Sequence, residues 1–173
     1  MNFRLHLLRL LAVWSILFPV LTSCIREYLE ECPQEYALRF CYDYNMKFTD
    51  LFADQVEDLS VYVFDWDGKY VRTFTDRGER LRDSEYKLVL PLAPGYYRFV
   101  VWAGLEGGSF TPASLQPGIS EESDLSLTLD RNENGEVPCD RRLAALWHSQ
   151  SETVEVPGPG SERTDTLLSL IHI

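Results

Sequence analysis

The thiol of Cys24 is the side chain whose setting in the sequence gives the clearest indication of chemistry. Leu21, Thr22 and Ser23 precede it, a leucine followed by two small side chains. A thiol can carry a diacylglyceryl group as a thioether, and small residues before it allow the backbone to enter a peptidase. This pattern is typical of the bacterial lipobox, which is cleaved just before its cysteine. We predict lipid attachment at Cys24 and signal peptidase recognition at Leu21, Thr22 and Ser23.

The segment before Cys24 has the composition of a secretory signal. Two arginines and a histidine make its start weakly basic, and residues 10–20 are almost all apolar. This run is shorter than the roughly 20 apolar residues of a membrane-spanning helix, and no comparable run follows residue 23. Residues 1–23 are therefore predicted to be a lipoprotein signal peptide. The alternative is an ordinary secreted protein in which Cys24 is incidental.

The charge of the chain limits its partners. Its 16 basic and 27 acidic residues give a net charge of −11, and loss of two arginines with residues 1–23 would leave −13. A nucleic acid needs a basic face, so it is not an expected partner. Two or three acyl chains, such as palmitate, suffice for stable attachment to a membrane. We therefore predict that the link to a membrane is this lipid anchor and not a membrane-binding surface of the protein.

Residues 24–34 are predicted to form a tether between the lipid and the first strand. Acidic residues soon follow Cys24, as in Glu27, Glu30 and Glu31. This resembles the surface-export signal of Bacteroidetes lipoproteins. A tether that is simply solvated explains the same residues equally well.

The remaining sequence predicts strands separated by turns. Only residues 50–58 have a helical pattern, with Thr49 as a candidate cap. Gly68 and the pair Pro94-Gly95 are suited to tight turns. Short strands with almost no helix predict an all-β sandwich. From alternating or β-rich patterns, the predicted strands are 36–42, 59–64, 69–74, 86–92, 96–103 (a central strand), 125–129, 154–156 and 166–173.

Two acidic segments have part of the pattern of a calcium site. Residues 130–135 place oxygen-bearing side chains at alternate positions before a glycine, but position twelve of the loop is Arg141 instead of glutamate. Asp65 and Asp67 lie in a loop of only four residues. Polar hairpin loops explain both segments better, and we predict no metal or other cofactor.

His148 is the histidine that an enzyme hypothesis would need. It lies between Trp147 and Ser149, and the sequence has no G-x-S-x-G motif, phosphate loop or metal-spaced Cys/His set. The acidic residues are too scattered to indicate a glycosidase pair. We predict a structural role for His148, no catalysis and no small-molecule substrate.

Three cysteines would remain after lipidation of Cys24. An oxidising compartment permits disulfides. Cys139 could pair with Cys32 or with Cys41, whereas a Cys32–Cys41 pair would need a sharp turn in an extended segment. The alternative is that all three thiols stay free.

The chain is rich in aromatic residues. Most fall at strand spacing and are predicted to be core, but an aromatic ring exposed on a sandwich can bind sugar. A glycan-binding adhesin therefore remains the alternative function. The aromatic residues in question are Tyr36, Phe40, Tyr42, Tyr44, Tyr62, Phe64, Tyr70, Phe74, Tyr96, Tyr97, Phe99 and Trp102.

The order of the motifs resembles that of the fimbrial anchor lipoproteins of Bacteroidia. The likeness covers essentially all of residues 21–173. One departure is Ser149, where the family commonly has glycine after an aromatic residue and histidine. The segments that carry the resemblance are Leu38–Phe48 with its Tyr-x-Tyr-Asn-Met motif, Leu59–Val71 with a Phe-Asp-x-x-Gly turn, Leu90–Leu105 with a Pro-Gly turn and a Trp-x-Gly strand end, and Leu146–Ser149.

The resemblance implies a transthyretin-like Greek-key β-sandwich and two such domains in a longer chain. Residues 35–156 would form the first domain, and 157–173 the linker and first strand of a second, truncated one. The alternative is that the last strand completes the first sandwich. The family also implies a non-enzymatic subunit that holds a fimbria to the outer membrane, limits its length, and docks a fimbrial shaft subunit.

Overall fold

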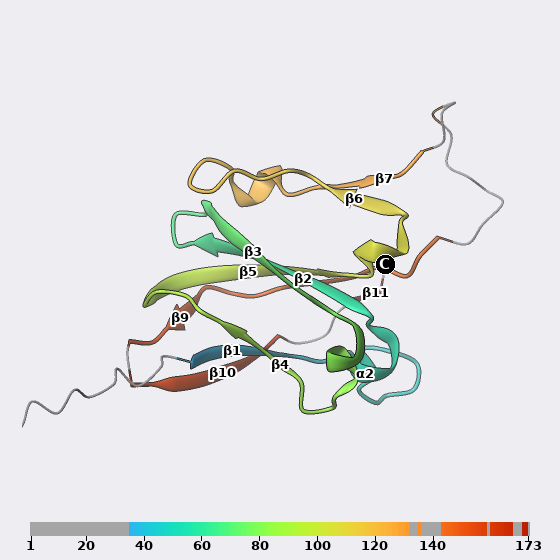
Figure 1. Cartoon of the computed structure of the whole chain (residues 1–173), viewed down its shortest axis with the longest axis horizontal. Helices are drawn as coiled ribbons and strands as arrows, with labels where there is room; N and C mark the ends of the chain where they lie inside the picture. The colour runs from blue at the N-terminus through green and yellow to red at the C-terminus, as the bar shows by residue number, and fades with distance from the viewer. Residues whose placement is uncertain (1–34, 132–134, 136–142, 159, 168–170, 173) are drawn as a thin grey trace, which may run out of the picture. The chain divides into compact units, whose positions relative to one another are not determined.

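The structure is a computed structural model that describes residues 35–131, 135, 143–158, 160–167 and 171–172 (Figure 1). All of these residues belong to one compact unit, Glu31–Ile173. The strands are β1 (Glu35–Phe40), β2 (Asp58–Asp65), β3 (Tyr70–Arg77), β4 (Lys87–Leu90), β5 (Gly95–Ala103), β6 (Phe110–Pro112), β7 (Leu127–Leu129), β8 (Trp147–Gln150), β9 (Val154–Val156), β10 (Glu162–Leu167) and β11 (Ile171–His172). The helical elements are α2 (Phe52–Gln55) and the 3-10 turns η2 (Gly78–Arg82), η3 (Leu105–Gly107) and η4 (Glu122–Asp124).

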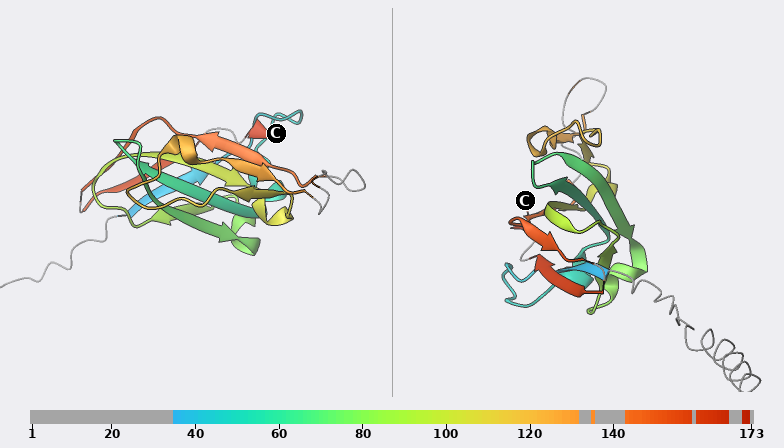
Figure 2. Two further views of the ribbon diagram at one scale, coloured as in Figure 1. Left: turned by 90° about the horizontal axis from the view of Figure 1, so that it is seen from above. Right: turned by 90° about the vertical axis from the view of Figure 1, so that its left-hand side faces the viewer.

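The strands form two facing sheets and a ribbon. One sheet has the order β11-β8-β5-β2-β3, with β9 also paired to β5, and the other has the order β10-β1-β4. The antiparallel ribbon β6–β7 covers the opposite side of the larger sheet (Figure 1), and the end-on view in Figure 2 separates these layers. This confirms the predicted all-β sandwich with β5 as a central strand.

The larger sheet is buried on both faces along its middle, which explains the runs of successive apolar residues Val61–Phe64 in β2 and Phe99–Ala103 in β5. Val61 and Val101 point toward the smaller sheet and join the main core with Leu38 of β1. On the opposite face, Tyr62 and Val100 belong to a second cluster that the segment before β7 covers. The strand between two buried faces needs apolar side chains at successive positions, not only at alternate ones.

The predicted hairpin between β2 and β3 is confirmed. Asp65 Oδ1 accepts hydrogen bonds from the backbone N–H of Asp67 at 3.1 Å and of Lys69 at 2.8 Å. Gly68 has a φ of 78°, which a side chain would disfavour. The predicted turn at Pro94-Gly95 differs in detail, because Gly95 already lies in β5 and pairs with Val156.

The predicted helix over 50–58 is only four residues long. Thr49 does not cap it; the N-cap residue is Leu51, which makes no side-chain capping bond. Instead, Asp50 Oδ1 accepts the backbone N–H of Phe52 at 2.9 Å. Phe52 is the buried residue of this turn and packs on Phe40.

The last predicted strand, 166–173, begins four residues earlier as β10. This strand runs parallel to β1, with Leu167 opposite Phe40. The side chains of residues 162–166 are mostly charged or hydroxyl-bearing, which suits an edge strand but gives no apolar alternation. A second domain beginning within 157–173 stays a prediction.

Candidate functional site

The residues predicted to carry the lipid chemistry lie outside the described part of the chain. They are Cys24 with Leu21, Thr22 and Ser23, and the disulfide candidates Cys32 and Cys139. Cys41 is described and carries a free, half-buried thiol. Burial, with Asp50 and Asp43 nearby, raises the pKa of this thiol to about 11. It therefore stays protonated at neutral pH, and the pairing of Cys139 remains a prediction.

His148 packs as a neutral ring on the larger sheet. Its ring centroid lies 4.3 Å from that of Trp102, and its Nδ1 is buried with no hydrogen-bond partner among the described residues. Burial lowers the pKa of the His148 imidazole, against an opposing hydrogen bond to the backbone of Val101. This setting fits the predicted structural role.

The acidic loops have other partners where the structure describes them. Asp130 Oδ1 accepts the hydroxyl of Thr111 at 2.8 Å, while residues 132–134 and Arg141 lie outside the described residues. Asp65 Oδ1 accepts the backbone N–H of Lys69 within its own turn. Among the described residues, no three His, Cys, Asp or Glu side chains are grouped to hold a metal ion, and no helix has the length and apolarity to cross a membrane.

Most of the aromatic residues predicted as core are buried, with two clear exceptions. Tyr44 and Tyr96 are exposed, and so are Phe48 and Trp66, for which the sequence pattern gave no warning. Phe74, Tyr97 and Trp102 are partly buried against the two clusters. The exposed rings lie on loops or at a strand start, where neighbouring strands do not cover them.

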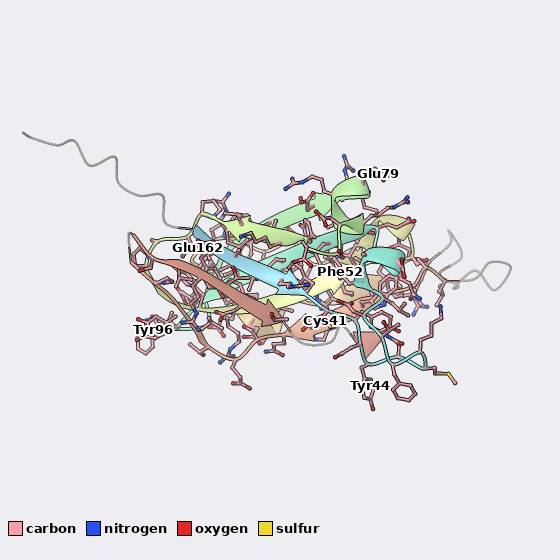
Figure 3. The ribbon with its side chains drawn as sticks, turned by 90° about the horizontal axis from the view of Figure 1, so that it is seen from below. Cys41, Tyr44, Phe52, Glu79, Tyr96 and Glu162 are labelled. Carbon is pink, nitrogen blue, oxygen red and sulfur yellow. The ribbon has the colours of Figure 1, made fainter. Side chains whose placement is uncertain are left out.

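An open groove of about 590 Å³ lies between the edges of the two sheets. On one side is β10, the end strand of the smaller sheet, and on the other are β9 and its connection to β8. Figure 3 labels Tyr96 and Glu162, which lie toward the same end of this side of the sandwich. The residues that line the groove are Leu38, Tyr96, Gln150, Ser151, Glu152, Thr153, Val154, Glu155, Arg163, Asp165 and Thr166.

The floor of the groove is fixed by hydrogen bonds to the central strand. Ser151 N–H donates to the carbonyl of Phe99 at 2.9 Å, and Ser151 Oγ accepts the Phe99 N–H at 2.9 Å. Within the described residues, β10 pairs with β1 only and β9 with β5 only. Their outer edges thus offer backbone groups to an extended peptide, which is the geometry of β-strand addition.

The charged residues on the β10 wall are paired with each other. Arg163 Nε lies 3.0 Å from Asp165 Oδ2, and Asp165 also accepts the hydroxyl of Tyr36 at 2.9 Å. Burial, together with the hydrogen bond to Asp165, raises the pKa of Tyr36 above its usual value. This network leaves the β10 wall polar but close to neutral, whereas the opposite wall carries the carboxylates of Glu152 and Glu155.

Asp58 is a buried carboxyl group at the other end of the larger sheet. It is 8% exposed, and its Oδ1 accepts the backbone N–H of Gly104 at 3.1 Å and of Leu105 at 2.8 Å. Burial raises its pKa above the usual 3.8, although these hydrogen bonds act in the opposite direction. Asp58 therefore fixes the chain after β5 and has the geometry of a structural group.

The raised pKa of Asp58 predicts a pH dependence of stability. Because the folded-state pKa lies above the unfolded one, the contribution of Asp58 is complete below about pH 3.8 and falls as the pH rises through the folded pKa. Asp58→Asn keeps an acceptor for both N–H groups without the charge. We expect it to match the wild type near pH 4 and to be more stable at pH 7, as measured by urea unfolding.

Asp58→Ala is the matched control for this experiment. It removes the side-chain acceptor, so the Leu105 N–H loses its partner and the Gly104 N–H keeps only the backbone carbonyl of residue 58, at 3.4 Å. Each N–H left without a partner costs about 1–3 kcal/mol. A stability loss of Asp58→Asn as large as that of Asp58→Ala at pH 7 would contradict the prediction.

The chain resembles several solved structures from Bacteroidales. A Bacteroides thetaiotaomicron protein proposed to bind polysaccharide is 35% identical, with a TM-score of 0.69 over 82% of this chain and 48% of its own. A proposed adhesin of Bacteroides ovatus is 26% identical, with a TM-score of 0.66 over 86% and 47%. The chain spans about half the length of these relatives. No curated protein matches the sequence.

The fimbrial anchor protein Mfa2 of Porphyromonas gingivalis has the same fold. It is 18% identical, with a TM-score of 0.65 over 82% of this chain and 51% of that one. The model of the family described as "Fimbrillin-A associated anchor proteins Mfa1 and Mfa2" matches residues 29–173. This match confirms the resemblance seen in the sequence, and the chain belongs to the Mfa2 fimbrial anchor family.

Proposed function

We propose that this chain is part of a lipid-anchored structural subunit that attaches a fimbria to the outer membrane and limits its length. The match of the anchor family to residues 29–173 carries this proposal. The family is one of structural proteins of the cell envelope, not of enzymes. The lipobox pattern ending at Cys24 supplies the attachment chemistry.

The tether keeps the sandwich close to its lipid. Ten residues lie between Cys24 and Glu35, the first residue of β1. Fully extended, they would span at most about 40 Å. A fimbria bound to the sandwich would therefore be held within one domain length of the membrane.

The groove between β9 and β10 is the proposed docking place for the fimbrial shaft subunit. Both bordering strands have an edge without a strand partner among the described residues. Main-chain hydrogen bonds to an added strand would supply the affinity. The polar side chains along the groove would fix which residues of the added strand pair with which residues of the edge. This mode needs no cofactor and no reaction.

The experiment for the anchor function changes Cys24→Ala alone in the full gene in its host. Without the thiol there is no thioether, so we expect fimbrial protein to move from washed cells into the medium. Cys41→Ala is the matched control, because this thiol is half-buried and its loss leaves the lipid in place. Fimbriae that stay on Cys24→Ala cells, or cells that make none, would overturn the proposal.

A glycan-binding adhesin is the second candidate function. It is favoured by the exposed ring of Tyr96 beside the groove and by the 35% identical relative that is proposed to bind polysaccharide. Saturable binding of a glycan that Tyr96→Ala abolishes would support this candidate. Docking of a shaft subunit by strand addition does not require the Tyr96 ring.

A further inference from the structure

Three large apolar side chains project into solvent from the loop between β1 and α2. Tyr44, Met46 and Phe48 are 79%, 96% and 92% exposed, and we call these three residues the apolar tip. Figure 3 shows Tyr44 on this loop, directed away from the sheets. Single exposed apolar residues are common on protein surfaces, but three on one short loop mark an interaction surface.

The loop that carries the apolar tip is held in shape by its own polar groups. Asn45 Nδ2 donates to the carbonyls of Tyr42 and Thr49, each at 2.7 Å, and Asn45 Oδ1 accepts the N–H of Lys47 at 2.9 Å. Asp50 Oδ1 accepts the N–H of Tyr42 at 2.9 Å. The tip is therefore presented in a fixed conformation, which lowers the entropic cost of binding.

Phe48 is unfavourable for the sandwich alone. Its φ is 53°, and it is the one described non-glycine residue with a positive φ. This region suits glycine or asparagine, and a bulky side chain there costs about 1 kcal/mol or more. Because the phenyl ring is exposed and its backbone is strained, it adds little to the stability of this sandwich, and we infer a contact outside the described residues.

The strongly acidic charge of the chain and, to a lesser degree, the direction of β1 argue against a membrane as this contact. β1 begins at Glu35, beside the predicted lipid tether, and ends at Phe40, where the loop begins. The apolar tip therefore lies at the end of β1 that is remote from the tether. The predicted net charge of −13 also opposes contact with anionic lipid.

The path of β10 indicates what lies near the apolar tip. β10 is parallel to β1, and its last residue, Leu167, is opposite Phe40. The chain then enters β11, where His172 pairs with Trp147 of β8. The Trp147 ring lies 6.3 Å from that of Tyr42, so the described chain ends beside the start of this loop. The solved relatives are about twice as long as the part that this chain matches.

We propose that the apolar tip packs against the downstream half of the polypeptide, the predicted second domain, and fixes its position on this sandwich. The occupant is an apolar surface of that domain, which the chain path delivers next to Tyr44, Met46 and Phe48. This contact requires the predicted second domain, but it does not require lipidation at Cys24. Its failure and the failure of the anchor function can therefore be told apart.

Hydroxyl-radical footprinting tests the contact with native side chains, because methionine and aromatic residues are oxidised according to their exposure. The 173-residue chain is compared with the full polypeptide that the gene encodes, both without residues 1–23. We expect oxidation of Met46 and Phe48 to fall severalfold in the full polypeptide. Trp66, which is 75% exposed on the β2–β3 turn, is the internal control and should not change.

The variant Phe48→Asn gives a second test of the same contact. Phe48→Asn suits a positive φ and should leave the 173-residue chain as stable as before, or slightly more stable. In the full polypeptide, it should raise Met46 oxidation toward the value of the short chain, whereas Trp66→Asn should leave Met46 protected. Equal oxidation of Met46 in both chains, protection that appears only when a fimbrial subunit is added, or Phe48→Asn without effect would overturn the proposal.

Discussion

Gly104→Ala is expected to destabilise the chain by about 3–5 kcal/mol, a large part of the 5–15 kcal/mol that holds a typical domain. Gly104 has a φ of 88°, and a Cβ built on it would lie 2.0 Å from the carbonyl oxygen of Ala145. That atom belongs to the backbone that enters β8, so it cannot rotate away as a flexible side chain would. Urea unfolding of the chain without its predicted signal peptide measures the loss.

Gly108→Ala separates the two causes of this effect. Gly108 also has a positive φ, 67°, but a Cβ there would meet no atom within 4 Å. Its substitution should cost only the conformational penalty of about 1–2 kcal/mol. If Gly104→Ala costs no more than Gly108→Ala, the close approach of the β5 end to Ala145 is not a constraint on the fold.

Gly104 also shows what the sequence could reveal and what it could not. The apolar run 96–103 was enough to predict where this strand ends, and β5 does end at Ala103. The reason for the glycine is a contact with Ala145, some forty residues away. In the same way, nothing local to Asp58 indicated that it would accept the N–H groups after β5.

Apolar residues, alternating in β1 and nearly continuous in β2 and β5, predicted these strands well. β1, β2 and β5 all fall within a residue or two of their predicted bounds, because burial of their side chains imposes the pattern. β10 was predicted too late because its side chains are polar, and its pairing with β1 depends on the backbone and on Tyr36. Edge strands generally give this weak signal.

The candidate site was predicted only in part. Lipid attachment at Cys24 stays a prediction, which local sequence alone can make because a lipobox is a linear motif. The groove between β9 and β10 and the apolar tip depend on which edges and loops remain uncovered after folding. The pattern that placed Tyr44 among core aromatics is the alternation of β1, which ends at Phe40, before this residue.

Tyr36→Ala is expected to destabilise the chain by about 3–5 kcal/mol and to loosen β10. The Tyr36 ring is fully buried and stacks on Phe99 with centroids 5.7 Å apart. Its hydroxyl holds Asp165 of β10 at 2.9 Å. The alanine variant loses both interactions and leaves a cavity between the sheets, so hydrogen exchange at the β10 amides should accelerate along with the loss in urea unfolding.

Tyr36→Phe divides this effect between packing and the hydrogen bond. The phenyl ring keeps the stack, and Asp165 keeps Arg163 and partial contact with solvent, so we expect a loss of only about 1 kcal/mol. A loss as large as that of alanine would mean that the hydroxyl, not the ring, holds the sheets together. Faster exchange at β10 in Tyr36→Phe with little change in global stability would instead show that this bond controls β10 alone. Since β10 forms one wall of the groove, Tyr36 would then control the order of the edge that we propose for docking.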